Sequence, residues 1–233
     1  MNVCLKLTVL LIAVGAVPPE TRIAAAADQE VWVGHQVVFG KTAVPFKGVE
    51  QTRSDSYLLA KVQRRGGEIH IEQAACKVTF KEISGVKINI PTDALLKLPS
   101  AHITFKSEGD VWRAVPWHVG WTRQDVDEDG TPGLSVEVDA SICSGTLHVA
   151  SSTLSKAVAK DTEDGLVGRI SVKVKQDVLG SDNVCLSLFS SDTVERQQGA
   201  FIYRRVPSDV TCKGLLEKPW PIKADIKGMT LEE

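Results

Sequence analysis

The sequence predicts an all-β protein, with a single antiparallel β-barrel or sandwich of about ten strands and one or two short helices. Three observations predict this fold. Apolar and polar residues alternate with a period of two in many short runs. Gly, Asp, Ser and Pro separate these runs at close spacing, as turns between antiparallel strands require. Helical periodicity is rare and brief, so the sequence lacks the crossover helices of a parallel α/β sheet.

The expected strands are the runs with this alternation. In the run 68–80, Ile69 and Ile71 alternate with His70 and Glu72, which places the polar side chains on a solvated face. The first half of the chain supplies the runs 31–39, 56–64, 68–80, 86–90 and 101–108. The second half supplies the runs 110–117, 134–140, 145–153, 167–180, 184–189 and 200–206.

Helices are expected at two places at most. The segment 91–99 predicts one short helix, because Thr92 or Asp93 can cap its start and Pro99 stops it. The segment 153–161 is either a second short helix or the continuation of a strand. Both alternatives stay open at the level of sequence.

The first 27 residues have the order of a secretory signal peptide. Lys6 precedes an apolar run from Leu7 to Val17, and two prolines and several small residues follow it. This apolar run has 11 residues, whereas a helix that spans a bilayer needs about 20. We therefore expect cleavage after Ala27, no transmembrane segment, and a periplasmic or secreted protein.

The rest of the chain shows no internal repeat and no low-complexity linker, so residues 28–212 are expected to form one domain. Residues 213–233 are interpreted as a C-terminal tail. This tail either frays, as chain ends commonly do, or docks the rigid PWPI segment around Trp220 against the barrel.

Charge excludes one class of partner. The whole chain has 27 Lys and Arg against 29 Asp and Glu, and removal of the signal peptide takes away two bases and one acid. Proteins that bind nucleic acid concentrate Lys and Arg on one face. This nearly balanced chain therefore offers no electrostatic argument for nucleic acid as a partner.

The cysteine count indicates an oxidising compartment. Cys4 leaves with the signal peptide, and four cysteines remain: Cys76, Cys143, Cys185 and Cys212. An even set in an exported protein predicts two disulfides, and the sequence leaves all three pairings open. A zinc site requires close cysteine pairs, which are missing here, and a catalytic thiol requires a histidine partner.

Residues 125–133, DVDEDGTPG, carry the most specific motif of the chain. Asp125, Asp127 and Asp129 alternate, and Gly130 follows at position six. Calcium takes six to eight oxygen ligands, and alternate carboxylates in a tight loop can point toward one centre. Calcium is therefore the candidate cofactor, and a plain acidic turn is the alternative.

The remainder of the motif excludes an EF-hand. Its twelfth position, where an EF-hand has a bidentate glutamate, is Val136, and Glu137 comes one residue late. The flanking segments also have the pattern of strands. Thr131, through its backbone carbonyl, and Glu137 or Asp139 are the candidates that complete the metal ligands.

A resemblance rests mainly on this motif. D-x-D-x-D-G-x-P-G ahead of LSVEV, followed by DGLVGRISVKVKQDVLG and FIYRRV…TC, resembles a group of uncharacterised exported bacterial β-rich proteins with a calcium-loop-like element. The likeness covers the region from Val119 to Cys212, and Glu128 stands where that motif often has glycine. The resemblance implies export and a calcium loop, and it implies no activity.

Three tryptophans precede the acidic loop within the segment 110–121: Trp112, Trp117 and Trp121, with His118 among them. Large aromatic side chains of this kind line ligand pockets, and they also fill cores. These four residues are the candidate ligand-binding residues, and core packing is the alternative.

No catalytic residue is assigned, since the G-x-S-x-G and H-E-x-x-H motifs and phosphate-binding glycine loops are all missing from the sequence. The leading hypothesis is a non-enzymatic β domain with a structural or binding role, tied by disulfides and calcium, with an envelope partner. The second is a lipocalin-like barrel that carries a small apolar ligand. The third is a secreted hydrolase or carbohydrate-active enzyme. Oligomeric state has no signature in the sequence.

Overall fold

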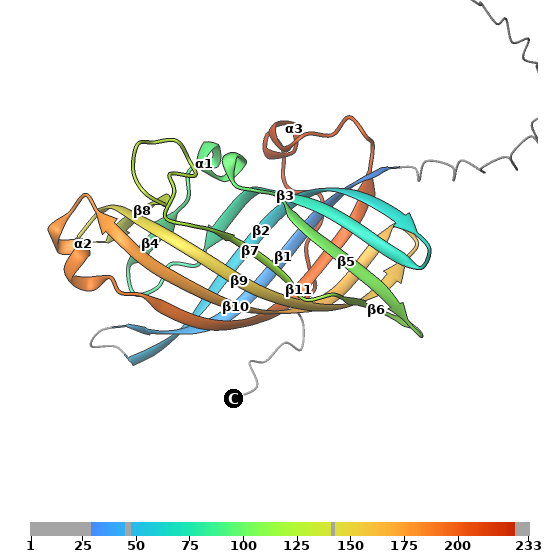
Figure 1. Cartoon of the computed structure of the whole chain (residues 1–233), viewed down its shortest axis with the longest axis horizontal. Coiled ribbons are helices and arrows are strands. Elements are labelled where there is room, and N and C mark those ends of the chain that lie inside the picture. Colours follow the sequence, from blue (N-terminus) through green and yellow to red (C-terminus); the bar gives the residue numbers. More distant parts are fainter. Residues whose placement is uncertain (1–28, 45–47, 141–142, 227–233) are drawn as a thin grey trace, which may run out of the picture.

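The computed structural model describes residues 29–44, 48–140 and 143–226, and it confirms the all-β prediction (Figure 1). Eleven strands form one antiparallel sheet: β1 Glu30–Val44, β2 Gly48–Arg65, β3 Glu68–Phe80, β4 Val86–Asn89, β5 Ala101–Glu108, β6 Val111–Ala114, β7 Trp117–Trp121, β8 Leu134–Ala140, β9 Gly145–Thr162, β10 Gly165–Ser181 and β11 Thr193–Val206. Three short helices accompany them: α1 Thr92–Lys97, α2 Val184–Phe189 and α3 Cys212–Leu216.

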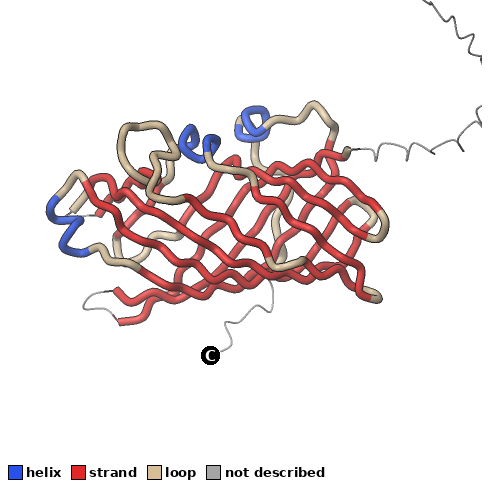
Figure 2. The backbone as a smooth tube through the Cα atoms, viewed as in Figure 1, coloured by secondary structure: helices blue, strands red, loops and turns tan. Residues whose placement is uncertain are grey.

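The sheet closes on itself, which decides between the two expected architectures in favour of a barrel. Strands follow the order β10, β11, β1, β2, β3, β5, β6 and β9, and β9 pairs with β10 to complete the ring (Figure 2). Along its other edge, β9 pairs in turn with β8, β7 and β6. Because β4 pairs only with β8 on this path, the barrel is uneven.

The interior of the barrel is filled by the inward side chains of its strands. Trp32, Phe105, Ile69 and Leu166 are among the largest fully buried side chains, and each is less than 2% exposed. They lie in one cluster with the inward residues of β2, β9, β10 and β11. A ring of eight strands has an interior about wide enough for such side chains to fill, so this cluster is the main core.

A second core cluster lies beside the acidic loop. Leu134, Val136 and Val149 pack with Ala94 of α1, and Val126 of the loop packs against them. Apolar residues from the helix, the loop and two strands therefore bury one another. This packing fixes the loop to the body of the barrel.

Two disulfides are present, as the cysteine count predicts. Cys76 pairs with Cys212 and Cys143 pairs with Cys185, with Cα–Cα distances of 5.2 and 5.9 Å. Both distances lie within the range of protein disulfides. The structure thereby selects one of the three pairings that the sequence leaves open.

The expected elements differ from the structure at a few places. The predicted helix within 91–99 is confirmed as α1, and the segment 153–161 continues β9 as a strand. The predicted strand 184–189 is wrong, because these residues form α2. Asn183 caps this helix by accepting a hydrogen bond from the backbone N–H of Cys185. The predicted strand 110–117 divides into β6 and β7 on either side of Pro116, which has no N–H to donate.

Of the two alternatives for the segment after Cys212, the docked one is observed as far as residue 226. Trp220 donates a hydrogen bond from Nε1 to the carbonyl of Gly34, at 3.1 Å, and its ring packs edge-on against Tyr57. The predicted signal peptide, residues 1–27, lies outside the described residues. Within the described ranges, every helix is too short to qualify as an apolar membrane span.

Candidate metal site

The acidic loop connects β7 to β8 and is closed at its base by backbone hydrogen bonds. Val126 donates to the carbonyl of Gly133, and Gly133 donates to the carbonyl of Gln124. Gly133 has a φ of +86°, and a Cβ there would lie 2.5 Å from the carbonyl oxygen of Val149. Only glycine fits this position without strain. The motif therefore forms a tight loop, with its ends held together.

The loop brings its three aspartates together, as their spacing predicts. One oxygen from each of Asp125, Asp127 and Asp129 lies within 4.8 Å of the others. Asp125 accepts hydrogen bonds from the N–H groups of Asp129 and Gly130, at 3.1 and 2.9 Å. These bonds curl the backbone around the carboxylate of Asp125, so the carboxylates converge because of the loop's own hydrogen bonds.

Asp127 occupies an unusual position for a carboxylate. Asp127 is only 6% exposed, and its Oδ2 accepts a hydrogen bond of 2.9 Å from the backbone N–H of Ser135. Its other oxygen, Oδ1, is buried and accepts no hydrogen bond from the described residues. Buried polar atoms almost always have a partner, and an unpaired buried charge is costly. This oxygen therefore lacks the compensation that a cation would supply.

Asp129 is exposed and bound to hydroxyl groups. Ser135 Oγ donates to its Oδ2, and the backbone N–H and Oγ1 of Thr131 donate to its Oδ1. These hydrogen bonds, that of Ser135 most of all, hold the pKa of Asp129 below its ordinary value. His148 Nδ1 lies 3.0 Å from the hydroxyl oxygens of both Ser135 and Thr131. Asp129 therefore stays ionised, as a metal ligand must.

A lysine from α1 provides positive charge beside the loop. Lys97 Nζ donates to the backbone carbonyl of Asp127, and it lies 3.2 Å from Glu128 Oε2. Glu128 has a φ of +58°, a conformation that glycine adopts most easily. Lys97 balances the charge of Glu128, so the carboxylate of Asp127 has no oppositely charged side chain within ion-pair distance among the described residues. The sequence gives no sign of Lys97, because it lies 30 residues from Asp127.

The structure places the other predicted ligands at different distances from this cluster. Thr131 lies in it, through its hydrogen bonds to Asp129. Glu137 accepts a hydrogen bond of 2.6 Å from Asn89 of β4, and the Oγ of Ser144 donates to Asp139. The three-aspartate group in the described residues includes neither acid. Ser135, which the sequence analysis did not select, makes contacts with two of the aspartates.

The tryptophan-rich segment does not form one site. Trp117 is 8% exposed and belongs to the main core, and Trp112 packs against the same cluster. Trp121 packs in the second cluster and donates from Nε1 to the carbonyl of Val149, at 2.9 Å. His118 is exposed. The structure thus divides these four residues between two clusters and the surface.

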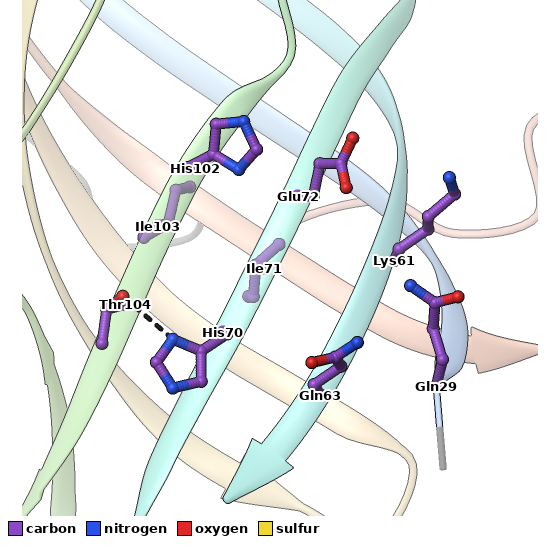
Figure 3. A pocket seen from close by; sticks show the side chains of 9 residues that line it. All are labelled: Gln29, Lys61, Gln63, His70, Ile71, Glu72, His102, Ile103 and Thr104. Atoms are coloured by element: carbon purple, nitrogen blue, oxygen red, sulfur yellow. Dashed lines mark hydrogen bonds between the residues drawn. The ribbon is translucent and has the colours of Figure 1, made fainter. Parts of the chain in front are cut away.

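A shallow hollow on the outer face of β2, β3 and β5 collects polar side chains (Figure 3). His70 lies there, with Nδ1 3.2 Å from Thr104 Oγ1 and Nε2 3.2 Å from Glu68 Oε2. Lys106 lies 3.0 Å from the other oxygen of Glu68. Both ring nitrogens of His70 are engaged by its neighbours on the sheet. This arrangement matches the solvated face that the alternation predicts.

Comparison with known proteins adds no family. No family model matches the chain, and no curated protein matches it. Among solved structures, a match is found to Pseudomonas aeruginosa OccK2 (OpdF), with 11% sequence identity and a TM-score of 0.16. The match covers 76% of this chain and 61% of that one. A similarity this weak carries no argument about fold or function.

Proposed function

We propose that this chain is an exported, disulfide-tied β-barrel domain that binds a calcium ion in the loop 122–133 and has a structural or binding role in the cell envelope or outside the cell. The observation that carries the proposal is Asp127 Oδ1, a buried carboxylate oxygen with no hydrogen-bond donor. Two further carboxylates converge on it. A bound cation would compensate all three charges at once.

The chemistry of the loop favours calcium over other ions. The cluster offers three carboxylates, whose oxygens are ligands for hard cations, and it contains no cysteine. Calcium accepts irregular sets of six to eight oxygens, whereas magnesium demands near-octahedral geometry. Asp125, Asp127 and Asp129 supply the carboxylates in this proposal, and the Thr131 carbonyl and water complete the ligands.

The ion would act as a cross-link. Asp127 is attached through Ser135 to β8, and its carbonyl is attached through Lys97 to α1. Binding at Asp127 therefore holds the loop, the strand and the helix in one arrangement. A domain that binds calcium only when folded gains stability from the ion by mass action.

Export is the second part of the proposal. Two disulfides fit a domain that folds in an oxidising compartment. The predicted signal peptide, residues 1–27, supports the same location in the periplasm or outside the cell. The resemblance to exported bacterial β-rich proteins with a calcium-loop-like motif belongs to this proposal and adds no activity to it.

Thermal unfolding with calcium or with a chelator tests the proposal. We expect calcium to raise the melting temperature of the wild type and to leave Asp127→Asn unchanged. Asp110→Asn, in the exposed turn between β5 and β6, is the matched control and should respond like the wild type. Equal melting temperatures of the wild type in calcium and chelator would overturn the proposal.

A further inference from the structure

The C-terminal segment after Cys212, residues 213–226, crosses the outer face of the barrel as a strap. It starts at the disulfide between Cys76 of β3 and Cys212, passes through α3, and runs behind the sheet in the view of Figure 1 toward the C-terminus. Trp220 and Ala224 contact β1. The strap is thus fixed covalently at one end and by non-covalent contacts beyond it.

The strand beneath the strap, β1, has an outer face that is buried. Trp32 points into the barrel core, so the alternation turns Val33, His35 and Val37 outward. These three residues are nevertheless 0%, 3% and 1% exposed. Ile222 of the strap is 6% exposed. An outer face of β1 that would otherwise meet water is therefore covered.

His35 joins the strap to the sheet and uses both of its ring nitrogens. Nδ1 accepts a hydrogen bond of 2.9 Å from the backbone N–H of Ala224, and Nε2 lies 3.3 Å from Asp55 Oδ1. A backbone N–H can only donate, so Nδ1 must carry a lone pair. The proton of the neutral ring therefore sits on Nε2 and faces Asp55.

We propose that His35 makes the strap a pH-sensitive latch: protonation of Nδ1 breaks its bond to Ala224 and frees the strap from β1, while the Cys76–Cys212 disulfide keeps it tethered. A protonated Nδ1 places two N–H donors face to face, so the Ala224 bond cannot persist. Histidine is the side chain that changes its charge in the physiological range. The proposal is independent of the calcium site.

The groups around His35 determine how protonation acts. On β2, Asp55 accepts two hydrogen bonds of 2.8 Å from Arg53, and the ring of Tyr57 lies 5.0 Å from that of His35. On the neighbouring β11, Arg204 is exposed, and on the strap Lys223 and Asp225 are exposed on either side of Ala224.

Asp55 does not titrate in the same range as a histidine. Burial raises its pKa, but hydrogen bonds from His35 and Arg53 outweigh burial and lower the pKa to about 2. Asp55 therefore remains charged on both sides of the transition. Its attraction to a protonated His35 acts through Nε2, and it leaves the conflict at Nδ1 unrelieved.

The freed strap uncovers an apolar strip of β1 around Val33 and Val37. Because Cys212 remains bonded to Cys76, the strap stays close to this strip and can return when the pH rises. Tethering of this kind keeps the effective concentration of the strap high. We therefore expect a reversible change without unfolding of the barrel.

Fluorine NMR of protein labelled with 5-fluorotryptophan tests the latch. The Trp220 resonance is assigned by its loss in Trp220→Phe. Between about pH 8 and pH 5, we expect this resonance to move reversibly to a solvent-exposed position, while that of the buried Trp32 stays constant. A Trp220 resonance that does not move over this range would overturn the proposal.

Two variants separate His35 from the other histidines. His35→Asn offers an oxygen near the position of Nδ1 that accepts from Ala224 and does not titrate, so its strap should stay closed over the whole range. His118→Asn, at an exposed position, should titrate like the wild type. Titration of His35→Asn with the wild-type midpoint would contradict the latch.

A second measurement covers the case in which His35→Asn does not fold. Nitrogen NMR of wild-type protein labelled in its histidines follows protonation of His35 directly. We expect the His35 signal and the Trp220 signal to change with the same midpoint. Different midpoints would show that the strap moves for another reason and would overturn the proposal.

Discussion

Replacement of Asp127 by asparagine should change stability in opposite directions with and without calcium. The substitution keeps the shape of the side chain and an oxygen that accepts from Ser135, and it removes the charge from the buried Oδ1. The new amide N–H can donate to the converging carboxylates of Asp125 and Asp129. Without a cation, Asp127→Asn should therefore be more stable than the wild type.

The size of this effect follows from the cost of an unsatisfied buried group. Such a group costs about 1–3 kcal/mol, and we take about 1 kcal/mol because the neighbouring aspartates are exposed. In a domain of this size, each kcal/mol shifts the melting temperature by roughly 2–4 °C. Asp127→Asn should thus melt roughly 2–4 °C above the wild type in chelator.

Calcium should reverse this order. Calcium sites of extracellular modules have dissociation constants on the order of 10⁻⁴–10⁻³ M. At about 10 mM calcium, a site at the tight end of this range, about 10⁻⁴ M, meets a hundredfold excess of the ion, which stabilises the folded state by about 2.7 kcal/mol. The wild type should therefore melt roughly 5–11 °C higher with calcium than with chelator, whereas Asp127→Asn should not respond.

The assay is thermal unfolding followed by circular dichroism, with disulfides intact, in chelator and in about 10 mM calcium. Asp110→Asn should follow the wild type in both conditions. The reasoning is refuted if Asp127→Asn is less stable than the wild type in chelator, because Oδ1 would then have a favourable partner without a cation.

Three further predictions concern the loop, the disulfides and acid stability. Gly133→Ala should destabilise the domain by about 2 kcal/mol or more, because its methyl group would clash with a backbone carbonyl at a position where φ is already strained for alanine. Gly130→Ala, where φ is +90° and space is open, should lower the free energy of unfolding by less in the same denaturant titration. Removal of the Cys76–Cys212 disulfide, whose cysteines are 136 residues apart, should lower the free energy of unfolding by about 1 kcal/mol more than removal of Cys143–Cys185, whose cysteines are 42 apart. Equal denaturation midpoints of the two double-alanine variants would contradict this chain-entropy argument. The pKa of Asp55 is lowered from its ordinary value of 3.8 to about 2, so the contribution of Asp55 to stability is complete above about pH 4 and is lost as the pH falls toward 2. In acid unfolding, Asp55→Asn should show a shallower loss of stability in this window.

The fold class is predictable because its signal is local. Alternation within β3, for example, needs only neighbouring residues to place Ile69 and Ile71 inward. Closure of the barrel depends on the pairing of β1 with β11, which joins the two ends of the chain, and on the pairing of β6 with β9. No short pattern encodes such pairing, so the sequence left barrel and sandwich open.

A local pattern predicts the wrong element when a strand and a helix are both compatible with it. The run 184–189 alternates like a strand, yet Asn183 caps it as a helix and Cys185 ties it to Cys143. The capping asparagine was visible in the sequence. The disulfide pairing that holds the helix in place was not.

The candidate metal site is likewise predictable only in its local features. The spacing of Asp125, Asp127 and Asp129 predicts their convergence, because the loop's own hydrogen bonds produce it. The burial of Asp127 depends on packing between the loop, α1 and β8, and the positions of Lys97 and Ser135 depend on the same packing. These tertiary features turn an acidic turn into a candidate metal site.

Calorimetric titration of calcium into the chelator-treated, disulfide-intact protein tests the central proposal most directly. We predict saturable binding of one calcium ion per chain in the wild type and in Asp110→Asn, and loss of that binding in Asp127→Asn. No saturable binding to the wild type, or the same binding in Asp127→Asn, would contradict it.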